Sequence, residues 1–194
     1  MASIDAQIAY APTAMELLKN QTRTVDAPLN GTYPRTGKAI TILKTSAGDI
    51  RINLIHRHAA CNDAAFEKLI EAKYFNNTSC HRMFNSEQGS VLQCGDPTGT
   101  GMGDPGFYTP DELPEYLINA AGAEYGMQAQ QITYPKGTVA VANSGPNTGS
   151  GQFFIALTDT QLAPSYTVIG VVDPADFSIL DKVKGYGIVL APGT

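Results

Sequence analysis

The chain of 194 residues carries 13 basic and 18 acidic side chains, which gives a formal net charge of -5. This balance leaves no surplus of Lys or Arg to neutralise phosphates, so it argues against binding to nucleic acid or to an anionic membrane surface. No apolar run approaches the roughly 20 residues of a membrane-spanning helix. The first thirty residues lack the basic start and apolar core of an export signal. The length predicts one domain plus an appendage.

The first part of the chain differs in pattern from the rest. Residues 1–38 hold little periodic apolar pattern and end in the turn-rich run Asn30-Gly-Thr-Tyr-Pro34. Gly and Pro in such a run interrupt helices and strands. We therefore predict an N-terminal extension or arm at 1–38 and a single domain at 39–194.

The domain begins with a predicted hairpin and a predicted helix. Apolar and polar residues alternate on both sides of Ser46-Ala-Gly-Asp49 within the segment 40–54, as in two antiparallel strands joined by a turn. Asn62 or Asp63 is a suitable N-cap, and apolar residues then recur at helical spacing as far as Tyr74. This helix has one apolar face, which must be buried against the strands.

Several short strand candidates and a second helix follow. Strands are expected at Ser90–Cys94, Gly137–Ala142, Phe153–Leu157 and Tyr166–Val172, and a helix at Ala175–Lys184. Many short strands with a helix near each end of the domain are typical of a small barrel. The predicted fold is mainly β, a closed antiparallel β-barrel of about eight strands capped by two α-helices.

Three local patterns suggest ligand chemistry only weakly. Gly101-Met-Gly-Asp-Pro-Gly106 matches a dinucleotide-binding pattern, but its proline cannot open the helix that such a site requires. His56 and His58 lack further ligands nearby in the sequence, so we predict no metal and no cofactor. The three cysteines show no C-x-x-C spacing; one disulfide with one free thiol remains open at this point.

Two longer segments carry a family resemblance. The first comprises Cys80-His-Arg-Met83 followed by Val91-Leu-Gln-Cys-Gly-Asp-Pro-Thr-Gly-Thr-Gly101, and the second is Val139-Ala-Val-Ala-Asn-Ser-Gly-Pro-Asn-Thr-Gly-Ser-Gly-Gln-Phe-Phe-Ile155. Both closely resemble the signature segments of the cyclophilin family of peptidyl-prolyl cis-trans isomerases, in order and separation. The likeness extends over about Ala39 to Ile188 and is greatest to the exported forms of high-GC Gram-positive bacteria.

The resemblance implies roles for individual residues. Arg82 matches the family's catalytic arginine, whose guanidinium would polarise the X-Pro peptide bond without transferring a proton. Phe154, Val91 and Leu162 resemble the apolar pocket that holds the proline ring. The implied substrate-binding residues are Gln93, Val91, Ala142, Asn143, Phe154, Leu162 and Tyr166, with glycines 99 and 101 shaping the adjacent groove. Alternation along the strand places Phe153 in the core.

The chain also departs from the family pattern near the pocket. Ser90 stands where an aromatic side chain usually lines the proline pocket, and the loop Phe84–Gly89 is longer than usual. We expect reduced pocket affinity unless Phe84 replaces the missing wall. Gln161 and Tyr166 stand where many relatives have a tryptophan and a histidine, so weak binding of cyclosporin is expected.

A second departure concerns barrel closure. The sequence stops at Ala191-Pro-Gly-Thr194, whereas relatives continue into a last strand that closes the barrel. The last strand is therefore expected to be missing or replaced, and the alternating residues of Ser3–Tyr10 are one hypothetical replacement. An uncovered edge would expose unpaired backbone groups.

The cysteines bear on the compartment. Cys61 and Cys80 resemble a cysteine pair of exported bacterial relatives, which implies a disulfide between them and an exported or cell-envelope location in preference to a cytoplasmic one. The alternative is two buried, reduced thiols in a cytosolic protein. Cys94 is interpreted as a buried apolar residue on its strand, without chemistry.

Two functions remain in competition. The first is an isomerase that accelerates X-Pro rotation in unfolded or folding proteins, which is supported by the retention of Arg82, Gln93 and Phe154. The second is a non-catalytic module that binds proline-containing segments, which is favoured by Ser90 and the longer loop. In both, the partners are proline-containing peptides and proteins.

Overall fold

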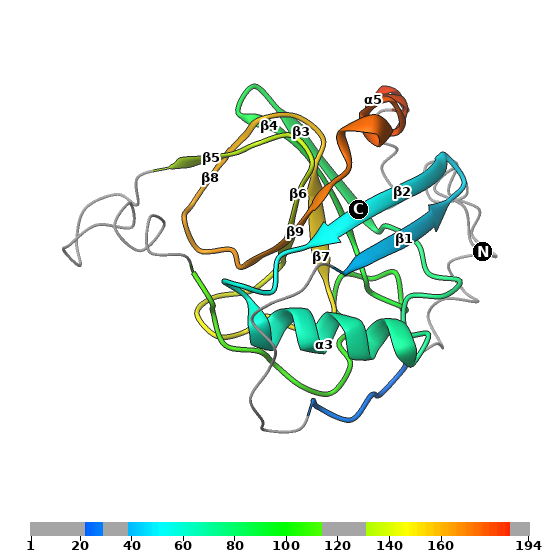
Figure 1. Cartoon of the computed structure of the whole chain (residues 1–194), viewed down its shortest axis with the longest axis vertical. Helices are drawn as coiled ribbons and strands as arrows, with labels where there is room; N and C mark the ends of the chain where they lie inside the picture. The colour runs from blue at the N-terminus through cyan, green and yellow to red at the C-terminus, as the bar shows by residue number, and fades with distance from the viewer. Residues whose placement is uncertain (1–21, 29–38, 114–130, 187–194) are drawn as a thin grey trace.

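The computed structural model describes residues 22–28, 39–113 and 131–186 of the chain. Figure 1 shows a curled sheet with one helix at each end. The helical elements are α3 (Ala60–Glu71), a short 3-10 turn η1 (Pro174–Asp176) and α5 (Phe177–Gly185). The strands are β1 (Ile40–Thr45), β2 (Gly48–Leu54), β3 (Arg82–Ser86), β4 (Gly89–Cys94), β5 (Ile132–Tyr134), β6 (Thr138–Val141), β7 (Phe153–Ala156), β8 (Thr160–Leu162) and β9 (Val168–Val172).

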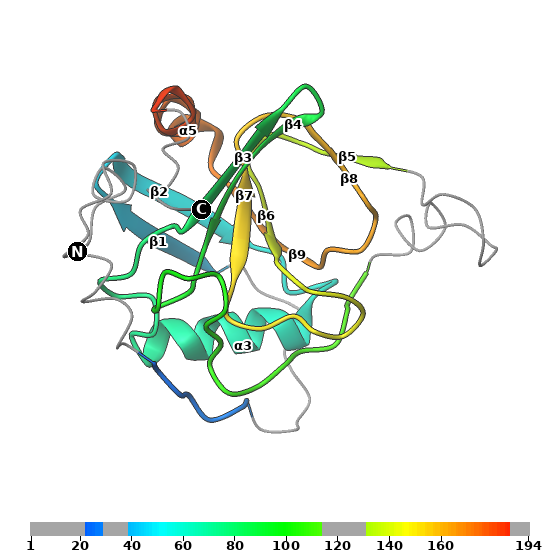
Figure 2. The same ribbon diagram turned by 180° about the vertical axis from the view of Figure 1, so that it is seen from behind.

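Seven strands form one antiparallel sheet in the order β1-β2-β9-β6-β7-β4-β3, and β5 and β8 form a separate pair. The sheet curls strongly, as both Figure 1 and Figure 2 show, but it does not close. Among the described residues, β1 and β3 remain its two edges, so the prediction of a closed barrel is wrong for this part of the chain. Mainly β structure with two helices is confirmed.

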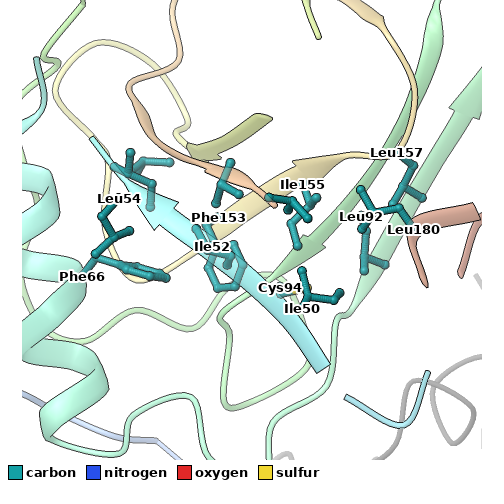
Figure 3. Close-up of a cluster of buried hydrophobic side chains, with 14 of the residues drawn as sticks. Ile50, Ile52, Leu54, Phe66, Leu92, Cys94, Phe153, Ile155, Leu157 and Leu180 are labelled. Atoms are coloured by element: carbon teal, nitrogen blue, oxygen red, sulfur yellow. The ribbon is translucent and has the colours of Figure 1, made fainter. Parts of the chain in front are cut away.

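The core lies inside the curl of the sheet. Strand alternation sends every second side chain of β2, β4 and β7 to the same interior. Figure 3 shows Phe66 of α3 and Leu180 of α5 packed with these side chains. Phe153 is 2% exposed and its ring meets that of Phe66 edge-on, with the two centroids 5.3 Å apart. The predicted core position of Phe153 is therefore confirmed, and both helices bury their apolar face against one core.

The helix α3 begins earlier than predicted. Its N-cap is Ala59, which makes no side-chain cap hydrogen bond, and Asn62 lies within the first turn instead of before it. The cap comes from a distant residue, because the Glu112 carboxylate accepts hydrogen bonds from the Cys61 N–H at 3.1 Å and the Asn62 N–H at 2.8 Å. A negative charge at a helix N-terminus satisfies unpaired N–H groups and the helix dipole together. Local sequence could not reveal a cap about fifty residues away.

Part of the predicted N-terminal arm contacts the domain. Arg23 donates from Nη1 to the carbonyls of Tyr74 and Asn76, both at 2.6 Å, just beyond the end of α3. The Val25 N–H donates to the Pro105 carbonyl at 2.9 Å. The hypothetical strand Ser3–Tyr10 and the final residues 191–194 lie outside the described residues. None of the described helices is both long and apolar enough to cross a membrane.

Candidate functional site

Three of the predicted site residues, Arg82, Gln93 and Phe154, share one row across the sheet. Arg82 of β3 pairs with Gln93 of β4, Gln93 pairs with Phe154 of β7, and Phe154 pairs with Ala140 of β6. Directly opposed residues of antiparallel strands point to the same face. The strands β3, β4 and β7 therefore place the Arg82 guanidinium, the Gln93 amide and the Phe154 ring in neighbouring positions. All three lie on the face of the sheet opposite to Phe153.

An aromatic cluster forms the apolar side of this face. The ring of Phe154 lies 5.2 Å from that of Tyr166 and 6.2 Å from that of Tyr134, both nearly perpendicular. The Tyr134 hydroxyl donates to the Ala163 carbonyl at 3.1 Å and accepts from the Tyr166 N–H at 3.3 Å. Leu162, which is half-buried, pairs with the start of β5. Tyr134 of β5 and Tyr166 thus both pack against Phe154, which is 4% exposed.

The segment between Arg82 and Gln93 is a regular hairpin and not an irregular loop. Its register ends at Ser86 opposite Gly89, so the turn has two residues. Phe84 lies opposite Val91, which places its partly exposed ring on the same face as Arg82. Ser90 is fully buried on the opposite side of β4. Phe84 therefore shares the face of Arg82 and Val91 while Ser90 lies on the opposite face, and the replacement of the missing aromatic wall by Phe84 stays a prediction.

A chain of hydrogen bonds holds the polar side of the site. Gln93 donates from Nε2 to Oε1 of Gln152 at 2.9 Å, and Gln152 donates to the carbonyls of Gly101 and Gly103, both at 3.0 Å. Because its amide nitrogen is engaged, Gln93 has its carbonyl oxygen available to accept from a substrate N–H. Gln152 was not singled out from the sequence, although it lies two residues before Phe154 and so shares its face.

The buried carboxylate of Asp96 organises the glycine loop that receives Gln152. It accepts hydrogen bonds from the N–H and hydroxyl of Thr98, both at 2.7 Å, and from the N–H groups of Gly101 at 2.6 Å and Gly103 at 3.2 Å. Burial works to raise the pKa of Asp96, but the bonds from Thr98 and from the backbone outweigh it and lower the pKa. Asp96 thus stays ionised and holds its loop at neutral pH.

Ala142 and Asn143 directly follow β6, at the edge of the same face. The Ala142 N–H is already used by the Gln152 carbonyl at 2.9 Å. The Asn143 side chain donates to the Ser165 carbonyl at 2.8 Å, which ties β6 to the segment before β9. Ala142, Asn143 and Gln93 together line a cavity of about 260 Å³. These three predicted residues therefore lie next to one another around the same cavity.

His56 lies beside two carboxylates of α3. His56 lies with Nδ1 3.2 Å from Oδ2 of Asp63 and Nε2 3.8 Å from Glu67. Neither oxygen of the fully buried Asp63 has a hydrogen-bond partner, and burial, with smaller effects of Glu67 and Glu112, raises its pKa to about 8. No cluster of three or more potential ligands suited to a metal ion occurs in the ranges that the structure describes.

The disulfide differs from the implied pair. Cys80 is bonded to Cys94, and Cys61 is a free, half-buried thiol. The implied Cys61–Cys80 bond is therefore wrong in this structure, and so is the interpretation of Cys94 as a residue without chemistry. The Cα atoms of Cys80 and Cys94 lie 3.9 Å apart at the open end of the β3–β4 hairpin.

Comparisons with known proteins agree with the fold and the segments described above. A family model described as cyclophilin type peptidyl-prolyl cis-trans isomerase/CLD matches residues 40–189. The "Probable peptidyl-prolyl cis-trans isomerase B" of Mycobacterium tuberculosis is 34% identical over 188 residues, which cover 96% of this chain and 59% of that protein. The protein of the same name from Mycobacterium leprae is 37% identical over 182 residues, covering 92% and 59%. The chain thus spans 59% of the length of these two curated relatives.

A shorter relative and a solved structure show the same similarity. The human "Peptidyl-prolyl cis-trans isomerase-like 1" is 35% identical over 135 residues, covering 67% of this chain and 70% of that protein. The crystal structure of a Cryptosporidium parvum cyclophilin type peptidyl-prolyl cis-trans isomerase superposes with a TM-score of 0.60 at 25% identity, covering 76% of this chain and 85% of that one.

Proposed function

Because the chain belongs to the family of cyclophilin-type peptidyl-prolyl cis-trans isomerases, we propose that it binds X-Pro segments of unfolded or folding proteins and catalyses rotation about the X-Pro bond. Rotation about a peptide bond crosses a barrier of about 18–20 kcal/mol, because the nitrogen lone pair is delocalised into the carbonyl. Uncatalysed X-Pro exchange accordingly takes tens to hundreds of seconds. The observation that carries the proposal is the single row of Arg82, Gln93 and Phe154.

In this proposal Arg82 lowers the barrier by binding the twisted bond. As the bond rotates, the lone pair returns to the prolyl nitrogen, which becomes a hydrogen-bond acceptor that the planar amide lacks. A guanidinium donates hydrogen bonds and remains charged at all relevant pH values. Arg82 is exposed on the edge strand β3, so a substrate can reach it directly. The interaction is stronger in the transition state than in the planar amide, which is the requirement for catalysis.

The aromatic cluster supplies the fixed side of the rotation. One side of the bond must be held while the other turns, and an apolar pocket that grips the pyrrolidine ring does this. Phe154, packed against Tyr166, forms one wall of this pocket together with Leu162, and Val91 with Phe84 continues the wall along the β3–β4 hairpin. Gln93 and the chain around Ala142 and Asn143 hold the substrate backbone. No cofactor enters the proposal.

Exchange spectroscopy on an Ala-Pro peptide tests the proposal. The wild-type protein should accelerate cis/trans exchange, and Arg82→Ala should reduce kcat/KM about 10²–10³-fold, the usual effect of removing one electrostatic donor. Arg57→Ala removes an equal charge from an exposed position next to His56 and is the matched control. Loss of acceleration in Arg82→Ala but not in Arg57→Ala supports the proposal; equal rates for Arg82→Ala and wild type would refute the role of Arg82.

A second candidate, the non-catalytic proline-binding module, has one observation in its favour. Ser90 is buried on the far side of β4, so the groove lacks the aromatic wall that the family usually places there. The same experiment decides between the two functions. Peptide binding measured by chemical-shift changes, without any acceleration of exchange, would identify a binding module.

We further propose that cyclosporin binds weakly and that nucleic acid is not a partner. Gln161 donates to the Thr133 hydroxyl at 2.6 Å, and Tyr166 packs against Phe154, so neither position offers the tryptophan or histidine of many relatives. A nanomolar inhibition constant would contradict the first statement. The net charge of -5 supports the second, because phosphate binding requires an excess of basic side chains.

A further inference from the structure

A polar cavity adjoins the row of site residues. Its volume is about 260 Å³, and Gln93 and Gln152 form its boundary with the site. On its other side lies the glycine loop that Asp96 organises, followed by the segment up to Tyr108. Because it opens next to Gln93 and Asn143, a peptide whose X-Pro bond lies at Arg82 would place a neighbouring side chain over this cavity.

The rim of the cavity is apolar and unusually exposed. Met102 is 84% exposed and Tyr108 is 66% exposed, the two highest values among the large apolar residues that the structure describes. Both line the cavity. Solvent-exposed apolar side chains beside a polar cavity can bind a ligand that has an apolar stem and a polar end. Lys and Arg side chains have this form. A tyrosine ring also attracts a cation over its face.

One charge lies within this rim. Among the described lining residues, only Asp104 has a side chain that carries a formal charge at neutral pH. Its Oδ1 accepts the Gly106 N–H at 2.7 Å, which fixes the carboxylate in a turn while further lone pairs remain available. The cavity thus combines one negative charge, three amide side chains and an apolar rim.

We propose that this cavity binds a Lys or Arg side chain of the substrate close to the X-Pro bond, and that Asp104 is the specificity-determining residue that selects the positive charge. The inference rests on the proposed function, since it assumes that peptide lies across Arg82 and Gln93. The aliphatic stem packs between Met102 and Tyr108, and the charged end meets the Asp104 carboxylate. The preferred substrates are therefore X-Pro segments with a basic residue near the proline.

Peptides that differ in one charge test this inference. Three series carry Lys, Glu or norleucine at the second residue before an Ala-Pro pair, and three carry the same residues at the second position after it. Exposed ion pairs are weak, so the wild-type protein should favour Lys over Glu about two- to fivefold in kcat/KM at one of the two positions. Raising the salt to 1 M should remove most of this preference, because exposed charges are screened.

Asp104→Asn isolates the charge. Asparagine keeps the oxygen that accepts the Gly106 N–H, so the turn is preserved. The Lys:Glu ratio should fall to about one while the rate for the norleucine peptide stays unchanged. Asp49→Asn, an exposed carboxylate at the β1–β2 turn, is the control and should keep the wild-type ratio.

The outcomes separate the two proposals. If norleucine peptides are isomerised but wild type and Asp104→Asn show the same Lys:Glu ratio at both positions, the charge-selecting role is refuted and the isomerase stands. If no peptide is isomerised, the proposed function itself fails. Loss of the preference in Asp104→Asn alone supports the inference.

Discussion

Phe153 and Phe154 are adjacent residues whose substitution should have equal effects on stability and different effects on catalysis. Phe153 faces the core, where its ring meets those of Phe66 and Phe75 edge-on at 5.3 and 5.6 Å. Phe154 faces the site, where its ring meets those of Tyr166 and Tyr134. Substituting each with leucine keeps an apolar side chain in place and removes two ring contacts in both variants.

The expected magnitudes follow from these contacts. An aromatic pair contributes about 0.5–1.5 kcal/mol beyond its buried area, so each variant should lose about 1–3 kcal/mol of unfolding free energy. In Phe154→Leu the pocket also loses the aromatic face against the proline ring. The variant should lose part of the binding free energy of one buried aromatic side chain, about 1–2 kcal/mol. This loss corresponds to a decrease of about five- to thirtyfold in kcat/KM. Phe153→Leu should leave kcat/KM per folded molecule unchanged.

Two measurements on the same samples test this reasoning. Urea unfolding followed by circular dichroism gives stability, since the chain has no tryptophan to serve as a fluorescence probe. Exchange spectroscopy at low denaturant gives kcat/KM for the folded fraction. Equal losses of catalysis in Phe153→Leu and Phe154→Leu would show that the two residues do not divide between core and site, and the assignment of Phe154 to the pocket would be abandoned.

Three further predictions concern charges and thiols. Thiol titration of the unfolded, unreduced protein should find one free thiol, that of Cys61, and reduction of the Cys80–Cys94 bond should lower stability by about 3 kcal/mol; three free thiols would contradict the pairing. Burial above all raises the pKa of Asp63 to about 8, above its value in the unfolded chain, so the free energy of unfolding should decline as pH rises from about 4 to 8. Urea unfolding at a series of pH values should show a flatter pH dependence for Asp63→Asn than for the wild type. An unchanged pH dependence in Asp63→Asn would refute the role of Asp63. Asp96→Ala removes the carboxylate that accepts hydrogen bonds from several backbone N–H groups. Hydrogen exchange in the glycine loop should therefore accelerate, and KM should rise by a larger factor than kcat falls. Unaltered hydrogen exchange in this loop would count against the organising role of Asp96.

Elements with strong periodicity were predictable from the sequence. The hairpin at 40–54 and the strands β4, β6 and β7 appear where alternating or continuous apolar residues indicated them, and α5 lies within two residues of its expected start. These elements bury one or both faces, and the buried positions must be apolar. Their apolar residues therefore recur with the period of the strand or helix, which is visible in the sequence. The helix α3 was recognised, but its start was displaced by the cap that Glu112 provides from outside.

Three strands and the openness of the sheet were not predictable in the same way. The strand β3 is exposed at nearly every position, so no burial pattern marks it, and it exists because it pairs with β4. The strands β5 and β8 have three residues each, too few for a period to be visible. Closure of the sheet depends on which distant segments meet, and local patterning does not specify this.

Individual residues of the candidate site were named only where a motif resemblance indicated them, and their roles stay predictions. Arg82, Gln93 and Phe154 were named separately, and the structure shows why they belong together, through a register that the sequence alone does not display. Gln152 and Asp96 lay inside the resembling segments without being identified, because their roles are to hold Gln93 and the glycine loop. Supporting residues of this kind have ordinary polar side chains, and only their contacts distinguish them.

The geometry of the proposed catalytic pair depends on how the β3–β4 hairpin is restrained. The strand β3 is an edge strand that pairs on one side within the described sheet, so Arg82 would be poorly fixed by strand pairing alone. A shift of one residue would turn Arg82 away from Gln93 and to the opposite face. The tight turn that follows Ser86 fixes one end of the hairpin, and the bond between Cys80 and Cys94 fixes the other end beside the Arg82–Gln93 pair. In the proposed mechanism the disulfide therefore acts on the site through register, because it holds the edge strand where the Arg82 guanidinium would face a bound peptide.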